Sequence, residues 1–514
     1  MKRLIPHRPA PRAAWTLATA WAAIAWMVLL ASPLAAQDPA AARLLRESER
    51  LLQGGNPEAA LEELELLVQQ FPNDQLAPAA MLRVAELQRA KGAQDKATAV
   101  LDRLIENHGR SSEAALAMLQ KAELTLGQAS TTTQLQDART AVRRVPLLFG
   151  RDAYPILEAR RRARTVSGEI CLLLGEAPDA AADFVAAIED EPPSPAIGRA
   201  QLGLARAWLM IDERAAATEV LERLKNADDT LTDPVSRQGA ADLLSLVHRR
   251  YLRPASGQDH WLSTSRYPAS GLALREPAGV AAAEDGRVLV VDPRLPLAAI
   301  ILPDGSVGDR SNLRDTERPG FDAQGNPFIA SENGILVPWG GRIRNLTDPR
   351  RGSPLKNLIA AAHGAFGDLY VVARGAKSLL HFPAGAGGRE LLADRRPEFV
   401  DVARDRQGRI YALDERGRSV LRLNRDGALE GSAAGSAAWK KPAAVDVDAL
   451  GFIYVLDRSL RRVELYSPGG QLLAAKGPNM GGGIELRSPE DLAVDGRGRV
   501  FIADSKLPFL VMLD

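Results

Sequence analysis

The sequence predicts a two-part protein, multidomain α plus all-β, in which an N-terminal α-solenoid is followed by a six-bladed β-propeller. Three observations lead to this prediction. Apolar residues in the first half recur at spacings of three and four, which is the period of a helix. A hairpin-sized pattern of small residues repeats there every 35 to 37 residues. Beyond Pro254 the period changes to two, and short strand-like runs each follow a glycine.

The composition is that of a chain that folds in water. Hydrophobic residues make up 46% and charged residues 25% of the 514 residues, which excludes disorder throughout the chain and a polytopic membrane protein. The net charge is +1, and neither half has the positive excess of a nucleic-acid-binding protein. The single cysteine, Cys171, excludes an internal disulfide and a cysteine metal cluster.

Residues 1–36 are expected to form a targeting segment. Four basic residues come first, an uncharged stretch covers residues 13–31, and small residues surround Ala36, which is the pattern of a signal peptide cleaved before Gln37. The alternative is an uncleaved inner-membrane anchor formed by residues 13–31, because this stretch is just long enough to span a bilayer. An exported chain with one cysteine fits a bacterial envelope, so we expect a periplasmic or exported protein that is soluble after cleavage.

Residues 37–252 are expected to form stacked helical hairpins. The clearest unit combines small residues, one aromatic and a terminal proline, at Gly168, Cys171, Gly175, Ala180, Phe184, Ala187 and Pro192. These residues resemble the tetratricopeptide repeat (TPR). In that family the small residues let two helices approach, the aromatic ring fills the gap and the proline ends the second helix. The resemblance implies a solenoid whose concave face binds a protein segment.

Two further features of this half leave alternatives open. A cluster of arginines is either a solvated helix face paired with nearby acids or a site for an acidic partner. Cys171 occupies a helix position that is expected to be buried, so we interpret it as a small core residue. The cluster consists of Arg139, Arg143, Arg144, Arg151, Arg160, Arg161, Arg162 and Arg164.

Residues 276–514 are expected to form six blades of about four strands each. The glycines that precede the strand-like runs are 39 to 47 residues apart, which is the repeat length of a propeller. The chain ends after the third strand of the sixth blade, so the segment 253–275, a linker that includes Trp261, is expected to supply the missing outer strand. The glycines are Gly286, Gly325, Gly367, Gly408, Gly451 and Gly498.

Three of these units are similar to NHL repeats. Each has a proline, an apolar strand, an Asp-x-x-Gly turn and a second strand that ends in Asp, at Pro397–Asp414, Pro442–Asp457 and Pro489–Asp504. We expect the aspartates to hydrogen-bond turns rather than to react. The second and third blades depart from the pattern, since Ser331 and Ala373 replace the terminal Asp, and are expected to be irregular.

The propeller channel is the place where chemistry would occur. The fold family includes amidating lyases and calcium lactonases, which place His, Asp or Glu ligands around the channel. Here the inner-strand position seven before each glycine carries Arg318, Asp401 and Asp491 in three blades, which are candidates for binding a cation or a small polar ligand. Only one histidine, His363, falls on an inner strand, so a three-histidine zinc site is not expected. We assign no catalytic, cofactor or metal residue.

A second candidate surface lies at the turns between second and third strands. Arg416, Arg418, Arg458, Arg461 and Arg462 come from equivalent turns of adjacent blades and are expected to form a positive rim. Replacement of the last three by serine is expected to leave folding intact and to weaken capture of an anionic protein, glycan or lipid headgroup.

The sequence therefore favours a non-catalytic adaptor of the cell envelope. The solenoid would bind other envelope proteins, and the propeller would bind a second, anionic partner. Nucleic acid is a ligand of some NHL proteins, but export argues against it here. Contact with the membrane is expected only if the signal is uncleaved. The alternatives are a ligand- or sugar-binding sensor that uses the channel, and a metal-dependent propeller hydrolase or lyase.

Overall fold

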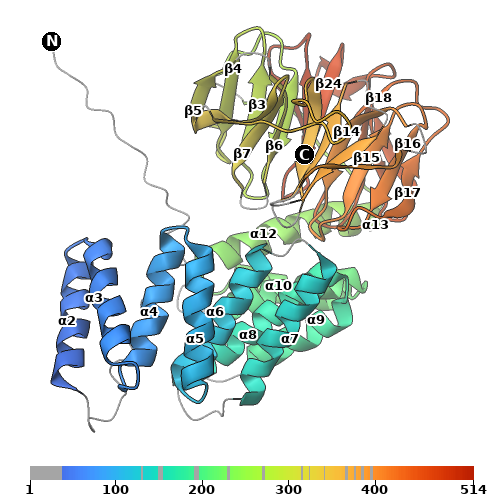
Figure 1. The fold of residues 1–514 in the computed structure, drawn as a ribbon. Helices are drawn as coiled ribbons and strands as arrows, with labels where there is room; N and C mark the ends of the chain where they lie inside the picture. The colour runs from blue at the N-terminus through green and yellow to red at the C-terminus, as the bar shows by residue number, and fades with distance from the viewer. Residues whose placement is uncertain are drawn as a thin grey trace, which may run out of the picture. The chain divides into compact units, whose positions relative to one another are not determined.

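The computed structural model divides into two compact units (Figure 1). It describes residues 38–128, 131–148, 154–189, 196–228, 232–268, 272–313, 316–322, 325–340, 342–364, 368–374, 378–383, 387–393 and 397–514. The expected targeting segment, Arg151 and Gly367 lie outside these residues. The first unit contains residues 1–127, 136–167 and 186–192, and the second contains residues 128–135, 168–185 and 193–514. No helix within the described residues has the length and apolar character that a membrane crossing requires.

The helical half is a row of hairpins joined by short turns. Three of the helices start at a proline preceded by a capping side chain, Asp38, Asn56 or Asp233, which accepts a hydrogen bond from a backbone N–H of the first turn. The helices are α2 (Pro39–Gln53), α3 (Pro57–Gln70), α4 (Ala77–Ala90), α5 (Gln94–His108), α6 (Ser112–Gln128), α7 (Thr132–Leu148), α8 (Tyr154–Leu174), α9 (Ala177–Glu189), α10 (Ile197–Met210), α11 (Arg214–Lys225) and α12 (Pro234–Val247).

The expected packing of small residues around an aromatic ring is present. Phe184 of α9 is fully buried, and its ring fills the space left by Gly168 of α8 and Gly203 of α10. A methyl group added at Gly168 would lie 2.8 Å from the ring, and one added at Gly203 would lie closer still. Helices α9 and α10 can therefore approach closely only because these positions lack a side chain.

The second half forms a six-bladed propeller of four-stranded antiparallel sheets. Blades 2 and 3 depart from the others as expected, because their outer strands have only three residues each. In order the strands are β2 (Gly279–Ala282), β3 (Val288–Asp292), β4 (Leu297–Ile301) and β5 (Val307–Asn312); β6 (Thr316–Phe321), β7 (Pro327–Ser331), β8 (Gly334–Val337) and β9 (Arg342–Arg344); β10 (Leu358–His363), β11 (Leu369–Ala373), β12 (Leu379–Phe382) and β13 (Arg389–Leu391); β14 (Phe399–Arg404), β15 (Ile410–Asp414), β16 (Ser419–Leu423) and β17 (Leu429–Gly435); β18 (Pro442–Val447), β19 (Ile453–Asp457), β20 (Arg462–Tyr466) and β21 (Leu472–Lys476); and β24 (Pro489–Val494), β25 (Val500–Asp504), β26 (Leu510–Leu513) and β1 (Thr264–Tyr267).

The first strand of every blade faces the central channel. These strands, β2, β6, β10, β14, β18 and β24, contact one another in sequence around the ring. Apolar clusters fill the space between neighbouring blades, and one of them contains Trp261. Strand β1 pairs with β26, with Thr264 opposite Leu513 and Tyr267 opposite Leu510, so the two ends of the propeller sequence meet in blade 6. This pairing covers an edge that would otherwise expose unpaired backbone groups.

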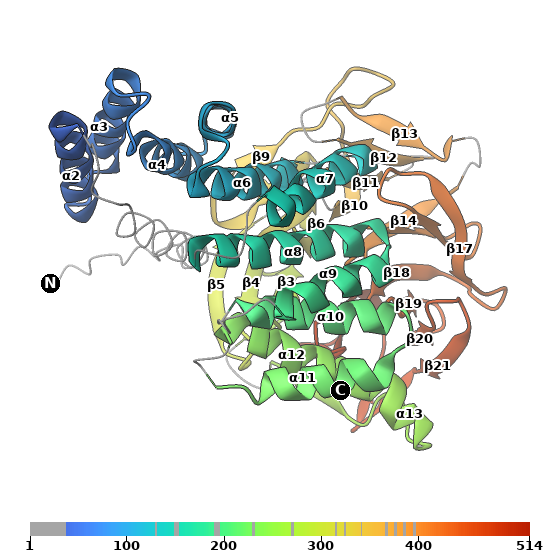
Figure 2. The same ribbon diagram turned by 90° about the horizontal axis from the view of Figure 1, so that it is seen from below.

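The change from helices to strands falls between residues 255 and 264, inside the expected linker. The compact unit that contains the propeller begins earlier, however, because it includes α10, α11 and α12 (Figure 2). Helix α12 continues into a π-helical turn, η1 (His248–Leu252), and a short helix, α13 (Arg253–Ala255). The guanidinium of Arg250 in η1 donates to the Gly498 carbonyl, and Arg497 pairs with Asp242 of α12. Polar contacts therefore join these helices to the turns of blade 6.

Candidate functional site: the propeller channel

A cavity of about 400 Å³ occupies the channel. Its walls come from the first strands of all six blades and from the turns that follow them. Small side chains at the inward positions, such as Ala281, Ala362 and Ala403, leave this volume open. The volume lies within the range of small-molecule sites, roughly 300 to 1,000 Å³.

The three channel residues expected from the sequence meet at one end of this cavity. Nη1 of Arg318 lies 2.5 Å from Oδ2 of Asp401 and 3.3 Å from Oδ1 of Asp491. Its Nη2 also donates to the backbone carbonyls of Ala443 and Glu490. Arg318 thus reaches from blade 2 to blades 4, 5 and 6. Because its cation lies between the two carboxylates, it already occupies the place where a bound cation would sit.

The inner aspartates also join neighbouring blades. Each accepts a hydrogen bond from a backbone N–H on the first strand of the next blade around the ring. The pairs are Asp401 with Val445 at 2.8 Å, Asp446 with Val494 at 2.7 Å and Asp491 with Val280 at 3.0 Å. These bonds have a structural role, since they fix the spacing of the strands that line the channel.

Asp446 is an inner acid that the sequence reasoning missed. It lies five residues before Gly451, whereas the candidates Arg318, Asp401 and Asp491 each lie seven residues before the glycine of their blade. Burial raises the pKa of Asp446 to about 7, against the effect of its two backbone hydrogen bonds. Burial likewise raises the pKa of Asp491 to about 7, although the positive charge of Arg318 opposes the change. The pKa of Asp401 is also raised by burial. The channel therefore holds carboxyl groups that are partly protonated near neutral pH.

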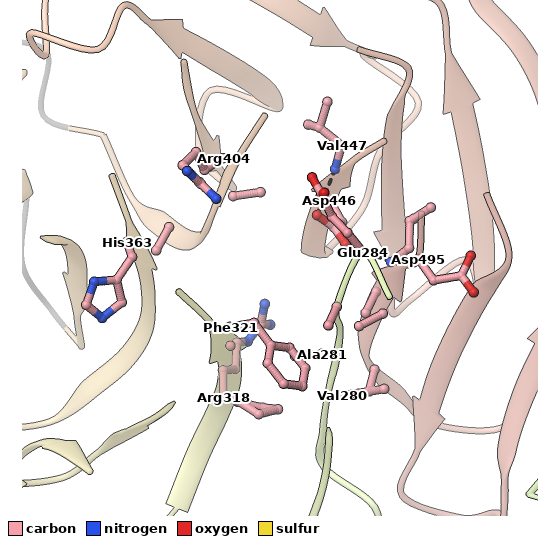
Figure 3. Close-up of a pocket in the computed structure, with 18 of the residues that line it drawn as sticks. Val280, Ala281, Glu284, Arg318, Phe321, His363, Arg404, Asp446, Val447 and Asp495 are labelled. Carbon is pink, nitrogen blue, oxygen red and sulfur yellow. Dashed lines mark hydrogen bonds between the residues drawn. The ribbon is translucent and has the colours of Figure 1, made fainter. Parts of the chain in front are cut away.

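Arginine side chains and a glutamate lie at the other end of the cavity, beside the turns between the first and second strands of the blades. Figure 3 shows Arg404 pointing into the cavity, while the ring of His363 turns away from its centre and stands edge-on to Phe328 at a centroid distance of 4.7 Å. Arg406 forms an ion pair with Glu284 across the mouth, from blade 4 to blade 1. Burial would raise the pKa of Glu284, but the charges of Arg406, Arg206 and Arg404 outweigh it and lower that pKa to about 2.

The aspartates of the turns have the structural roles expected for them. Asp405, Asp448 and Asp495 each accept hydrogen bonds from backbone N–H groups of their own hairpin turn. Asp504 accepts bonds from the entry to its blade at Arg487 and Ser488. Asp292, Asp414 and Asp457 make the same type of contact. In blade 2 the hydroxyl of Ser331 donates instead to the Gly334 carbonyl, which suits a shorter turn.

The five rim arginines lie at the turns between second and third strands, but four of them are paired with glutamates. Arg418 donates to the backbone carbonyl of Ala437 at 2.8 Å. Their charge is thereby largely neutralised, which the sequence alone did not indicate. Their role in partner binding stays a prediction. The pairs are Arg416 with Glu398, Arg458 with Glu490, Arg461 with Glu485 and Arg462 with Glu464.

The arginine cluster of the helical half also has internal partners. Arg161 and Arg164 donate to backbone carbonyls in the last turn of α9, and Arg161 is buried. Such carbonyls have no partner within their own helix, so these side chains complete the hydrogen bonding of the helix end. Arg162 forms an ion pair with Glu123 of α6 at 2.9 Å. Cys171 is fully buried, as expected for a core residue.

The part of the chain that the structure describes contains no cluster of three His, Cys, Asp or Glu side chains arranged to hold a metal ion. The acids of the channel instead hold Arg318 and backbone N–H groups. Their arrangement can accept hydrogen bonds from a polar ligand.

Comparison with known proteins finds one family match in the helical half and several solved structures that resemble the propeller. The family model of the tetratricopeptide repeat matches residues 79–111, and no curated protein matches the sequence. The propeller is similar to virginiamycin B lyase from Staphylococcus aureus, with 12% identity, coverage of 49% of this chain and 98% of that chain, and a TM-score of 0.35. A gluconolactonase from Xanthomonas campestris shows 19% identity, coverage of 47% and 86%, and a TM-score of 0.37. The calcium-binding protein regucalcin from Agrobacterium tumefaciens shows 15% identity, coverage of 48% and 93%, and a TM-score of 0.36.

None of these similarities assigns an activity to this chain. The family match at residues 79–111 covers most of α4 and all of α5, and the six sheets close into a ring. The chain contains a tetratricopeptide repeat in a helical N-terminal region, followed by a six-bladed β-propeller.

Proposed function

We propose that this protein is a non-catalytic adaptor of the bacterial cell envelope. The solenoid binds one protein partner, and the propeller binds a second, anionic partner. The observation that carries this proposal is the covalent union of a tetratricopeptide-repeat region with a closed propeller in one chain. Repeats of this kind present extended faces to protein segments, and two such modules in one chain can hold two partners near each other.

The solenoid offers a polar strip for a partner. Arg83 and Glu86 of α4 form an ion pair at 2.7 Å, and the amide of Gln120 on α6 lies 3.4 Å from the same glutamate. Burial raises the pKa of Glu86, whereas the charge of Arg83 and its hydrogen bond lower it. Gln120 is buried and Glu86 nearly so, which leaves Arg83, whose side chain is 25% exposed, as the group of this strip that a partner segment can contact.

Two further parts of the proposal rest on the sequence. The basic start and the uncharged residues 13–31 support export to the periplasm, with an inner-membrane anchor as the alternative. The Asp-x-x-Gly turns support an NHL-type propeller. In the channel, the engagement of Asp401 and Asp491 by Arg318 supports a role in binding rather than in catalysis.

The adaptor is tested by capture of partners in cells. Full-length tagged protein is crosslinked, and the captured proteins are identified. Arg83→Ser in α4 is expected to reduce capture of one partner, while substitution of the rim residues Arg416 and Arg458 reduces capture of a different one. Arg103→Ser, an exposed arginine of the neighbouring helix α5, is the matched control. If both groups of variants lose the same partner, or neither loses any, the proposal that the protein binds partners through two separate surfaces is wrong.

A second candidate function is favoured by the geometry of the channel. The sensor alternative requires Asp401 and Asp491 to face inward, and both line the cavity. Together with a volume of about 400 Å³, this supports binding of a small polar ligand. The propeller would then report the presence of that ligand to a partner on the solenoid.

A further inference from the structure

The entry segments of the blades repeat a basic residue at one position. This position precedes the last residue of the second strand by the same interval in every blade, as Arg275 precedes Asp292. Five of the six blades have arginine or lysine there, and blade 4 has Pro397 instead. The propeller therefore repeats a positive charge that is separate from the rim arginines. The basic entry residues are Arg275, Arg314, Lys356, Lys440 and Arg487.

The structure leaves these side chains exposed. The side chains of Arg275, Lys356, Lys440 and Arg487 reach solvent and form no ion pair or hydrogen bond with a residue that the structure describes. Arg314 lies outside the described residues. In blades 1, 5 and 6 the entry residue donates its backbone N–H to the aspartate that ends the second strand, so the three segments present their side chains at equivalent places. The bonds are Arg275 to Asp292 at 2.6 Å, Lys440 to Asp457 at 2.7 Å and Arg487 to Asp504 at 2.7 Å.

The entry segments lie on the face that also carries the turns between second and third strands. The second strand of each blade separates this face from the turns between first and second strands, because a strand is extended and its two ends lie apart. The helices bond the propeller at the latter turns, where Arg250 reaches Gly498 and Asp242 pairs with Arg497. These contacts are therefore at the far end of the blades from the basic entry residues.

A hollow of about 320 Å³ lies on this face between blades 6 and 1. Glu490 in its wall is engaged, since it pairs with Arg458 and accepts a hydrogen bond from the Ser505 hydroxyl at 3.1 Å. The side chains of Glu276 and Arg294 have no partner among the described residues. The hollow therefore offers one free carboxylate and one free guanidinium. Its lining residues are Glu276, Ala278, Pro293, Arg294, Glu490 and Ser505.

Free positive charge surrounds the hollow. Arg294 and Lys506 occupy equivalent turns of blades 1 and 6, where each donates its backbone N–H to the aspartate two residues earlier. Lys506 is exposed like the entry residues and makes no described ion pair. Four of the five rim arginines, in contrast, are paired with glutamates. The charge that an anionic partner can use on blades 5, 6 and 1 is therefore that of the entry residues and of these two turns.

From this arrangement we infer that the propeller binds an acidic protein segment across blades 5, 6 and 1. The acidic side chains of the segment contact Lys440, Arg487 and Arg275, and one basic side chain enters the hollow beside Glu276. Arginine and lysine bind carboxylates through charge-assisted hydrogen bonds. A polypeptide fits better than an anionic glycan or a lipid headgroup, because it can place a single ammonium group among several carboxylates. The inference rests on the proposed anionic partner of the propeller and adds its class and its place.

Fluorescence anisotropy with the full chain tests the inference with three labelled probes. The first is a glutamate-rich peptide with one central lysine, the second is the same peptide with a central alanine, and the third is an oligosaccharide of uronic acids. We expect the lysine peptide to bind about threefold or more tighter than the alanine peptide, which is the range of exposed ion pairs. An oligosaccharide that binds as tightly as the lysine peptide would overturn the assignment to a protein segment. Binding of no probe would overturn the site, and the adaptor itself would still be judged by capture of partners in cells.

Variants locate the site. Changing Lys440, Arg487 and Arg275 together to serine should weaken binding of the lysine peptide about tenfold at low salt and less at high salt. Glu276→Gln should remove the preference for the lysine peptide over the alanine peptide. Peptide binding unaffected by both changes would contradict the assignment.

Two further variants serve as comparisons, and circular dichroism checks that all variants fold. The matched control changes Arg223, Arg287 and Arg422 to serine, which removes the same charge from paired arginines and should leave peptide binding unchanged. The rim variant combines Arg416→Ser with Arg461→Asn. If the rim variant loses the peptide and the entry variant does not, the proposed anionic partner binds at the rim and the inference is wrong, while the proposed function stands.

Discussion

Nε of Arg250 lies 3.4 Å from Oδ2 of Asp448, and neither side chain is exposed to solvent. The same guanidinium donates to the Gly498 carbonyl at 2.9 Å, and the Tyr454 hydroxyl donates to Asp448 at 2.8 Å. Burial raises the pKa of Asp448, while the charge of Arg250 and the Tyr454 hydrogen bond oppose that rise. This buried pair joins η1 to the turns of blades 5 and 6 and so helps to hold helices α10 to α12 in one compact unit with the propeller.

We predict that Arg250→Ala destabilises the protein by about 3 to 5 kcal/mol, because removing one partner leaves a buried charge without compensation. The measurement is urea unfolding followed by tryptophan fluorescence. Arg223→Ala is the control: its pair with Glu219 is exposed on both sides, and its loss should cost about 1 kcal/mol or less. Equal effects of the two substitutions would show that the buried pair does not hold the helices to the propeller.

The packing of Phe184 provides a second prediction. Gly203→Ala places a methyl group against the Phe184 ring and should destabilise the helical region by about 1 to 3 kcal/mol. The double variant Gly203→Ala, Phe184→Leu should recover part of this loss, because the smaller side chain leaves room for the methyl group. Gly387→Ala is the control, since an added methyl group there meets no atom within 4 Å. Thermal unfolding followed by circular dichroism gives the comparison, and failure of the double variant to recover stability would argue against a steric cause.

The raised pKa values in the channel predict a pH dependence of stability. With a pKa of about 7 in the folded state against 3.8 ordinarily, Asp446 binds a proton in the folded protein that the unfolded chain has lost. Its stabilising contribution is fully present below about pH 4 and is lost as the pH rises through 7, so stability should fall between pH 5 and 8.

Asp446→Asn should make that fall shallower, because an amide does not titrate. Asp491, whose pKa is also about 7, should preserve the remainder of the slope. Urea midpoints at pH 5, 6, 7 and 8 measure the effect, with the exposed Asp285→Asn as a control. A variant whose slope equals that of the natural protein would show that Asp446 is ionised throughout this range.

The architecture could be predicted from the sequence because most blades repeat the same local signals. The glycine before each second strand and the aspartate after it act within one hairpin, so their spacing is visible without a structure. The convergence of Arg318, Asp401 and Asp491 followed from the same repeat, since equivalent positions of inner strands must face one channel.

Other features depend on contacts between distant segments. The pairing of Arg250 with Asp448 follows from how η1 packs against the propeller, and no local pattern in the sequence signals it. The glutamates that neutralise the rim arginines come from other strands and loops. These ion pairs could be predicted only with knowledge of which strands pair and in which register. The inward position of Asp446 could have been predicted from the sequence, because a residue two positions after Ala444 must face the same side of the strand.

The last prediction concerns the rim arginines, and the structure changes the choice of residues to substitute. The sequence favoured changing Arg458, Arg461 and Arg462, with folding left intact. Arg462 is unsuitable, however, because its partner Glu464 is buried and also accepts a hydrogen bond from the Trp439 indole at 2.7 Å. Removing Arg462 would leave the buried carboxylate of Glu464 without its cation, which would destabilise the folded protein.

Arg416→Ser, Arg458→Ser and Arg461→Asn together avoid this effect. Asparagine suits residue 461, where φ is 52°, because it tolerates the left-handed region. If the rim binds an anionic partner, the triple variant should capture less of it in pull-downs with the full chain.

The loss should be greatest at low salt, because ions screen exposed charges over about 8 Å at physiological ionic strength. A second triple variant, with Arg223, Arg287 and Arg422 changed to serine, removes the same charge from paired arginines elsewhere and should bind normally. Equal capture of the partner by both variants across a salt series would show that the rim arginines contact solvent and do not bind the partner. Partner binding would then be sought on the polar strip of α4 and α6.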